Sequence, residues 1–270
     1  MKKTIITLIA CMWLHAGFSQ ILADHVDFSG YAPTRLDQFK GTCYAYATTY
    51  TALTIKFNLL KKAQTMQEIN DNAFSAAFTA SMVRKQRFLL AKLFNFWSCS
   101  SGGNIEKAAK IIQEKGAIFN NDQKGCCFVP GAKQIKDAAS FKIKDFSIIL
   151  KVDDKRDQEV IKAQFKGYLS QKIPIVCAIH QTDMLRGNKQ IDFVLPAAGD
   201  SEIKGDTYKN SNHAICIVGY DDRRNGGAFL VKNNYSSFGV NGRSWINYAD
   251  FFKYLSYALV LGDFETPPSN

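Results

Sequence analysis

The spacing of apolar residues predicts that the first half of the chain is helical. After Cys43, apolar side chains stand at positions 46, 47, 50, 53, 57 and 60, and the polar side chains opposite them are Thr54, Asn58, Lys61 and Lys62. Such spacing places the apolar residues on one face of a helix. Residues 66–94 and 104–116 show the same amphipathic pattern, and Gly116 stands where a helix would end.

The second half of the chain predicts antiparallel strands. Short apolar runs alternate there with turn-rich segments such as DDRRNGG and SSFGVNG. The predicted strands cover residues 174–179, 213–220, 228–233, 244–248 and 257–261. Helices followed by such strands indicate an α+β fold with two lobes. We expect a helical lobe over residues 20–135, a β lobe over 136–264 and a loose tail over 265–270.

The first residues predict a targeting segment. Lys2 and Lys3 precede an apolar run that ends in small residues, which is the layout of a secretory signal peptide. We expect a signal peptide over residues 1–19, cleavage near Ser19 or Ala23, and a secreted or periplasmic protein. The apolar run is too short for a convincing membrane span. LIAC at 8–11 also resembles a lipoprotein cleavage box, so lipidation of Cys11 is a second interpretation.

Charge and cysteine spacing exclude several kinds of partner and site. The 270-residue chain has a net charge of +10, and its lysines are spread out rather than gathered in a block. This distribution predicts at most a weak attraction to anionic polymers, and we identify no nucleic-acid-binding module. No two cysteines have the CxxC spacing of a zinc or redox motif, so we expect no metal.

The cysteines after the targeting segment fall into three groups. Export permits a disulfide, and we expect one between Cys99 and either Cys126 or Cys127, whose adjacency leaves the pairing open. Cys177 and Cys216 stand inside apolar strands and predict buried thiols. The third group is Cys43 alone, at the start of a predicted helix.

Cys43 is a candidate nucleophile because of that position. Partial positive charge at a helix N-terminus favours a thiolate, and a nearby histidine completes an ion pair. Taken alone, such a cysteine is more often a buried structural thiol. The histidines after the targeting segment are His25, which we expect in a flexible terminus, His180, which we expect on the surface or at a strand end, and His213.

His213 opens a predicted strand, and the next strand returns past it. In an antiparallel hairpin, the residue numbers of directly paired residues add to a constant total. Pairing Tyr220 with Ala228 across the DDRRNGG turn gives a total of 448, and His213 and Asn233 add to 446, two less. The two residues should therefore lie about one diagonal step apart at the open end of a hairpin. An amide there can orient an imidazole. Because a strand alternates, only one of Asn233 and Asn234 can face His213.

Three segments, in this order, resemble papain-like cysteine peptidases, especially secreted bacterial forms. DQFKGTCYAYA (37–47) resembles the nucleophile segment, with Tyr44 where the family usually has tryptophan. SCSSGGNIEKAAKIIQEKGAI (98–118) resembles the Gly-Gly wall of the substrate cleft and the helix after it, and residues 212–251 are similar to the histidine and asparagine blocks. The resemblance implies a two-lobed papain-like fold, with a helical N-terminal lobe, an antiparallel, barrel-like C-terminal lobe and the active-site cleft between them.

The resemblance also implies a role for each matching residue. Cys43 would be the nucleophile, His213 the general base and then the acid, and Asn233 the residue that orients His213. Gln38 would donate to the oxyanion together with the backbone N–H of Cys43. For the substrate, the implied residues are Gly102 and Gly103, which would expose backbone for strand pairing, and Asn212, whose carbonyl would hold the residue at the scissile bond.

The sequence departs from the family pattern in the residues just before Cys43. Gln38 stands five residues before Cys43, where the family has six. Either the loop is tightened and still delivers the amide, or the oxyanion site is degraded. Lys40 replaces a cysteine that often pairs with one near the Gly-Gly, so Cys99 lacks that partner. We also expect no long inhibitory propeptide, because the signal peptide ends close to the match.

These observations predict an exported cysteine peptidase. We expect an endopeptidase that forms an acyl-enzyme on a peptide or protein substrate, without metal or organic cofactor, as a monomer. Two alternatives remain open at this point. One is a weak or inactive papain-fold protein that only binds peptides, and the other is an acyltransferase that uses the same triad.

Overall fold

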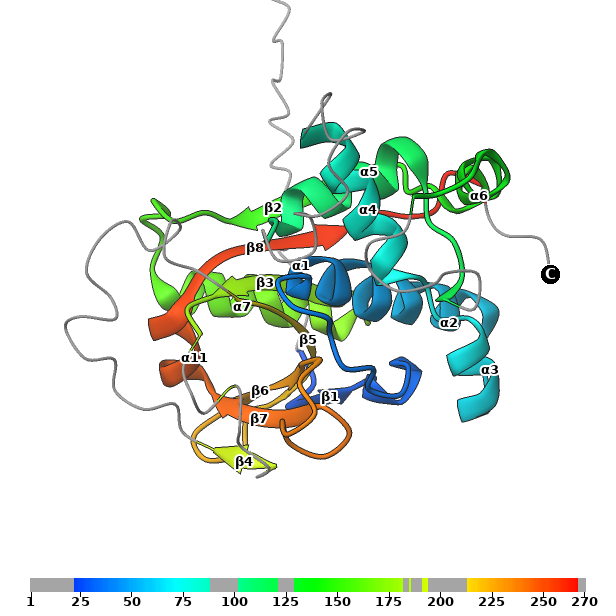
Figure 1. The fold of residues 1–270 in the computed structure, drawn as a ribbon. Helices are drawn as coiled ribbons and strands as arrows, with labels where there is room; N and C mark the ends of the chain where they lie inside the picture. The colour runs from blue at the N-terminus through cyan, green and yellow to red at the C-terminus, as the bar shows by residue number, and fades with distance from the viewer. Residues whose placement is uncertain are drawn as a thin grey trace, which may run out of the picture.

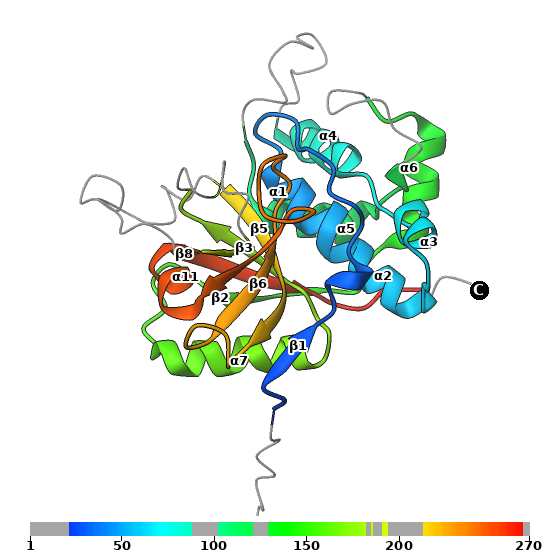
Figure 2. The same cartoon turned by 90° about the horizontal axis from the view of Figure 1, so that it is seen from below.

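The computed structural model describes residues 22–87, 102–120, 129–181, 185, 191–193 and 213–266. The predicted signal peptide and Cys11, the cysteines of the predicted disulfide (Cys99, Cys126 and Cys127), and Asn212 lie outside the described residues. In the described part, the helices of residues 43–138 gather on one side of a curved sheet, whereas the helices of residues 158–170 and 248–254 lie apart from them (Figures 1 and 2). None of the described helices is long and apolar enough to cross a membrane.

The described helices come mainly from the first half of the chain, as predicted. They are α1 (Cys43–Ala45), π-helix η2 (Tyr46–Leu53), α2 (Thr54–Lys61), α3 (Met66–Asp71), α4 (Ala76–Arg87), α5 (Ile105–Lys115), α6 (Ala132–Ala138), α7 (Gln158–Ser170) and α11 (Tyr248–Tyr254), with short 3-10 turns η1 (Ser29–Tyr31) and η4 (Ala139–Phe141). Helix α7 packs against the sheet through β3 and β5 (Figure 2).

The described strands form one sheet of eight. They are β1 (His25–Asp27), β2 (Phe146–Leu150), β3 (Ile175–Ile179), β4 (Asp192–Phe193), β5 (His213–Asp221), β6 (Ala228–Lys232), β7 (Arg243–Asn247) and β8 (Leu255–Leu261). All five predicted strands are present, with bounds within two residues of the prediction.

The sheet is open, which corrects the barrel-like expectation. Its order is β2-β8-β3-β5-β6-β7-β4, with β1 added beside β5. The pairs are antiparallel except for β4 with β7. Among the described residues, the two end strands β2 and β4 do not pair with each other, and a barrel requires that closure. The helix-then-strand α+β architecture is otherwise as predicted.

The helix that begins at Cys43 runs between the other helices and the sheet. Its π-helical part contacts α4 and α5 on one side and β3 and β5 on the other. The predicted polar face is wrong for Thr54 and Asn58, which are fully buried, and the predicted apolar face is wrong for Leu60, which is exposed. The Thr54 hydroxyl accepts a hydrogen bond from the N–H of Phe74 (2.9 Å), and Asn58 Nδ2 donates to the carbonyls of Tyr31 (3.1 Å) and Ile69 (3.2 Å), so both of these buried side chains are paired.

The predicted helix over 66–94 is interrupted. Helix α3 ends at Asp71, and α4 begins after Ser75, whose hydroxyl accepts from the N–H of Phe78 (3.0 Å) and caps the new helix. Between the two helices, Phe74 stacks on Phe119 with ring centroids 5.1 Å apart. The predicted helix over 104–116 is confirmed as α5.

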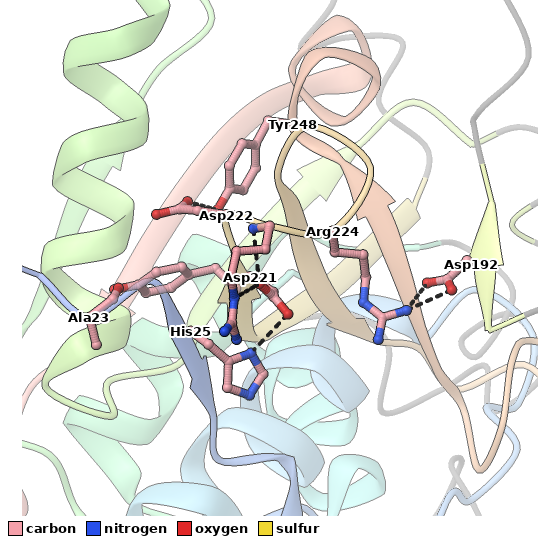
Figure 3. Close-up of polar contacts among 9 residues, drawn as sticks. Ala23, His25, Asp192, Asp221, Asp222, Arg224 and Tyr248 are labelled. Atoms are coloured by element: carbon pink, nitrogen blue, oxygen red, sulfur yellow. Dashed lines mark hydrogen bonds and ion pairs between the residues drawn. The ribbon is translucent and has the colours of Figure 1, made fainter.

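Strand β1 fixes the N-terminal segment to the far end of β5. Val26 pairs with Tyr220, and the Tyr220 hydroxyl donates to the Ala23 carbonyl (2.7 Å). His25 lies 3.3 Å from the Asp221 carboxylate, as Figure 3 shows. His25 is thus part of a strand, and the expectation of a flexible terminus is wrong for this residue.

Candidate active site

Cys43 is the first residue of a continuous run of helix that extends through η2 and α2 to Lys61. Thr42 precedes it as the N-cap residue, and the Thr42 hydroxyl donates to the Phe39 carbonyl (2.6 Å). The first N–H groups of a helix have no partner within the helix and carry partial positive charge. The Cys43 sulfur therefore lies where a developing negative charge is favoured.

Burial acts against that charge. The Cys43 side chain is only half-buried, yet desolvation raises the pKa of its thiol to about 11, while the backbone N–H groups of Ala214, Tyr44 and Cys43 itself lower it. The contribution from Ala214 places the sulfur beside the start of β5, directly after His213. A thiolate here needs a cation that forms with it, because the N–H groups alone do not offset the loss of water.

His213 is buried at that same end of β5, with 3% of its surface exposed. Its Nε2 lies 2.9 Å from Asn233 Oδ1. The amide of Asn233 is oriented by two other bonds: its Nδ2 donates to the Leu185 carbonyl (3.1 Å), and its Oδ1 accepts from the N–H of Asn234 (2.7 Å). Since Oδ1 can only accept, Nε2 of His213 must carry a hydrogen. A neutral His213 therefore keeps its lone pair on Nδ1.

Tyr235 is a neighbour of His213 that the sequence analysis missed. The two rings stack with centroids 4.6 Å apart and planes 8° from parallel, and the Tyr235 hydroxyl lies 3.3 Å from Nδ1. The register would have found it. Cys216 of β5 pairs with Lys232 of β6, and continuing that pairing along the chain places position 235 opposite His213.

Asn234, the other asparagine of the pair, joins three parts of the site. Its Nδ2 donates to the Leu36 carbonyl (3.1 Å), and its own carbonyl accepts from the N–H of Gln38 (2.9 Å). Its Oδ1 accepts from the Thr51 hydroxyl on the nucleophile's helix (3.4 Å). The side chain of Asn233 thus contacts His213, while Asn234 holds the loop that carries Gln38.

The loop before Cys43 is tight. Lys40 has the left-handed φ of 49°, and the side chain of Gln38 folds back so that its Nε2 donates to the Lys40 carbonyl (2.9 Å). The Gln38 Oε1 is buried, with no hydrogen-bond partner in the described part of the structure. A primary amide has two N–H hydrogens, so the bond to Lys40 leaves a second one for another acceptor.

The two glycines lie beside the start of the nucleophile's helix. A Cβ on Gly103 would come 2.4 Å from the Tyr44 ring, so only glycine lets this backbone lie against the residue that follows Cys43. Gly102 has a φ of +64°, which also favours glycine. Helix α5 starts directly afterwards, with the Asn104 side chain accepting from the N–H of Lys107 (2.8 Å).

Comparisons with known proteins identify the fold. No protein-family model and no curated protein matches the chain. Among solved structures, xylellain, a cysteine protease from Xylella fastidiosa, is similar with a TM-score of 0.65 and 20% sequence identity, over 90% of this chain and 87% of that one. The chain has the papain-like fold.

Two other structures with this fold extend the comparison. Digestive procathepsin L 3 of Tenebrio molitor larval midgut has a TM-score of 0.63 and 18% identity, over 91% of this chain and 71% of that one. The proform of the ragweed pollen cysteine protease Amb a 11 has a TM-score of 0.56 and 17% identity, over 92% and 67%. The predicted papain-like fold class is thus confirmed. The roles of individual residues rest on the contacts described above.

Proposed function

We propose that this chain is an exported cysteine peptidase with Cys43, His213 and Asn233 as its catalytic triad. The observation that carries the proposal is the bond between His213 Nε2 and the oriented amide of Asn233, at the end of β5 where the Cys43 sulfur meets Ala214. That bond leaves Nδ1 as the nitrogen that can take a proton from the thiol. The papain-like fold shared with three cysteine proteases supports the same activity.

The proposed reaction follows from this arrangement. The Cys43 S–H proton moves to Nδ1 of His213, and the thiolate forms a bond to the carbonyl carbon of the peptide. When the C–N bond breaks, the proton on Nδ1 goes to the leaving amine and an acyl-enzyme remains. Water then cleaves the thioester, with His213 accepting its proton.

Two donors are proposed for the oxyanion: the backbone N–H of Cys43 and the free hydrogen of the Gln38 amide. The tightness of the 38–41 loop supports this role, because the bond to the Lys40 carbonyl holds the amide in place. For the substrate backbone, we propose Gly102, Gly103 and the carbonyl of Asn212, as an extended peptide pairs with exposed backbone.

The proposal is tested by cleavage of a denatured protein under reducing conditions. We expect wild type to cleave it, Cys43→Ala to have no activity, and Gln38→Ala to lose about 10²–10³ in turnover. A thiol-directed epoxide inhibitor should form a covalent adduct on Cys43 and on no other cysteine. An intact substrate after incubation with folded wild type would refute the peptidase.

The same data test the alternative of a peptide-binding protein. One observation favours that alternative: the Gln38 amide is already engaged with Lys40, and its oxygen is buried without a described partner. A protein of this kind would bind peptides by calorimetry and leave them uncut. An acyltransferase on the same triad would instead give product joined to an added amine.

Export is proposed from the signal-like N-terminus. The contact between the Tyr220 hydroxyl and the Ala23 carbonyl (2.7 Å) favours cleavage near Ser19, since cleavage after Ala23 would remove that acceptor. N-terminal sequencing of exported protein should give a start between about residues 16 and 22. An intact Met1 would contradict export, and a diacylated Cys11 would favour the lipoprotein.

A further inference from the structure

The tight turn at the start of β7 contacts two separate parts of the proposed active site. Its outer residues, Val240 and Arg243, pair through two backbone hydrogen bonds (2.9 and 3.0 Å). Asn241 and Gly242 between them have left-handed φ angles of 52° and 72°. Asparagine followed by glycine is the pair that such a two-residue turn favours. We call residues 240–243 the NG turn.

The first contact of the NG turn is with Asn233, the proposed triad asparagine. The carbonyl of Gly242 accepts from the N–H of Asn233 (2.8 Å). The packing is close, because a Cβ on Gly242 would come 2.4 Å from the Asn233 carbonyl oxygen and 3.1 Å from Cγ of Arg35. Gly242 therefore lies between the backbone of Asn233 and the side chain of Arg35, where a larger residue does not fit.

The second contact is with the segment that leads to Gln38. The side-chain Oδ1 of Asn241 accepts from the N–H of Arg35 (2.9 Å), three residues before Gln38. Beyond Arg35, Asn234 bonds the same segment at the carbonyl of Leu36 (3.1 Å) and at the N–H of Gln38 (2.9 Å). Asn241 thus supplies the first of three successive bonds, and the last is made by the residue proposed as an oxyanion donor.

Lys232 supports the NG turn from the interior. It is 1% exposed, and its Nζ donates to the carbonyl of Asn241 (2.6 Å). Burial, together with the nearby cations Arg243 and Arg35, lowers the pKa of Lys232 to about 7. Burying an ammonium group beside other cations costs free energy. The contribution of Lys232 to the structure is therefore its bond to the NG turn.

We propose that Asn241 and Lys232 are positioning residues of the peptidase, which hold the segment carrying Gln38 in place relative to Asn233. The proposal rests on the proposed function, with Gln38 as an oxyanion donor. Asn233 and Gln38 come from distant parts of the chain, and the NG turn bonds the neighbourhood of both. Oxyanion stabilisation requires donors that are already in place, so a loosened connection lowers kcat with little change in KM.

The test compares variants of Asn241 in peptide cleavage by the whole chain. Asn241→Gly removes the acceptor and keeps the left-handed backbone, and we expect kcat to fall about tenfold. Asn241→Asp keeps an acceptor oxygen and tolerates the same backbone, so its kcat should stay about fivefold above that of Asn241→Gly. Asn225→Gly is the matched control, because it makes the same change at a left-handed asparagine at the opposite end of β6, and its kcat should equal that of wild type.

A double variant shows whether Asn241 acts through Gln38. In Gln38→Ala the donor is already absent, so adding Asn241→Gly should cause little further loss of kcat. A merely structural role of Asn241 would lower kcat by the same factor with and without Gln38, and that result would overturn the proposal. An unchanged kcat in the single variant Asn241→Gly would overturn it as well.

Lys232→Met tests the support of the turn. This variant removes the amino group and keeps a long apolar side chain, so we expect kcat per folded molecule to fall about fivefold. Its thermal unfolding midpoint at pH 7 should stay at or above that of wild type, because no cation is buried any longer. A loss of kcat without a loss of stability separates positioning from folding. An unchanged kcat would remove Lys232 from the proposal.

Failure of the positioning role is distinguishable from failure of the peptidase. Alkylation of Cys43 needs the thiolate and no oxyanion donor, so iodoacetamide should label wild type and Asn241→Gly alike at mildly acidic pH. His213→Ala should abolish that labelling. If wild type labels only as an ordinary thiol does, the proposed function fails. If wild type labels at low pH and cleaves peptide while Asn241→Gly keeps full kcat, only the positioning role fails.

Discussion

Strand β5 carries a histidine contact at each end, and the two contacts are built differently. At the site end, His213 is 3% exposed, and its named side-chain partners are the amide of Asn233 and the phenol of Tyr235. At the far end, the His25 side chain is 40% exposed, and its partner is the carboxylate of Asp221 (Figure 3). One histidine is buried against an amide and a phenol, and the other is a solvated member of an ion pair.

This difference decides what each histidine can do. A buried imidazole with neutral partners gains little from charging alone, so its proton is best taken up together with the formation of an anion nearby. The half-buried thiol of Cys43, whose pKa is raised to about 11, in turn loses its proton most readily when a cation forms beside it. At the far end, water screens the His25–Asp221 pair, so this pair adds little to the backbone pairing that holds β1.

The largest expected effect separates the two histidines by activity. His213→Ala should lower kcat/KM by about 10²–10⁴, the usual contribution of a general acid–base group. His25→Ala, which removes a contact at the opposite end of β5, should leave kcat/KM within about twofold. Both variants should be compared with wild type on one peptide substrate, after thermal unfolding has shown that each is folded. Equal losses would mean that the two ends are coupled through the strand.

The second prediction concerns a lysine buried at the site end. Lys232 pairs with Cys216 of β5, is 1% exposed, and donates from Nζ to the Asn241 carbonyl (2.6 Å). Burial, with Arg243 and Arg35 nearby, lowers the pKa of Lys232 to about 7. At the far end, by contrast, Arg224 bonds the Asp192 carboxylate at 2.6 Å.

The sign of the pH effect follows from that pKa. Between pH 7 and about 10.4, the unfolded chain keeps a proton on Lys232 that the folded protein has released. Stability therefore rises with pH across this window and falls as pH drops towards 7. Urea unfolding should give an increase of about 2–3 kcal/mol from pH 7 to pH 9, at about 1.4 kcal/mol per unit. Lys232→Met should lose this increase, and Lys155→Met, at an exposed position, should keep it.

The sequence predicted the contact at the site end through a register that is only partly right. The prediction paired Tyr220 with Ala228, whereas the structure pairs Tyr220 with Phe229. An irregularity between Ile217 and Gly219 shifts the register by one residue. On the His213 side of it, the numbers of paired residues add to 448, the predicted total. The proximity of His213 to Asn233 therefore survived an error at the turn. A bulge of this kind leaves no clear pattern in a single sequence.

What the sequence could not predict depends on distant neighbours. Thr54 and Asn58 have the residue types of a solvent-facing helix side, yet they are buried, because helices and sheet enclose this helix on both sides. Strand β1 is three residues long and exists through its pairing with β5, nearly two hundred positions later. The fit of Gly103 against the Tyr44 ring likewise joins separate segments. Local propensity contains no information on such contacts.

The third prediction tests whether the site end acts as one unit. Asn234→Ala removes the bonds to the Leu36 carbonyl and the Thr51 hydroxyl and leaves those groups without this partner. We expect a loss of about 1–3 kcal/mol in stability and a fall in kcat of about tenfold with little change in KM, because the Gln38 loop is loosened. Asn72→Ala is a suitable control, since it removes a side-chain hydrogen bond to Asn58 away from the site. An unchanged kcat in Asn234→Ala would show that the loop holds its position without this residue.

The smallest effect is expected at the far end. The His25–Asp221 contact is 3.3 Å long, with side-chain exposures of 40% and 14%, and Asp221 also bonds the exposed Arg223. Exposed ion pairs contribute about 0–1 kcal/mol and weaken with salt. His25→Ala should therefore lower the free energy of unfolding by less than about 1 kcal/mol. The difference from wild type should shrink at 1 M salt.

Tyr220→Phe, which loses the bond to the Ala23 carbonyl, compares the pair with a neutral hydrogen bond at the same strand end. If His25→Ala cost several kcal/mol regardless of salt, β1 would be held by this histidine rather than by its backbone pairing, and the contrast between the two ends of β5 would be wrong.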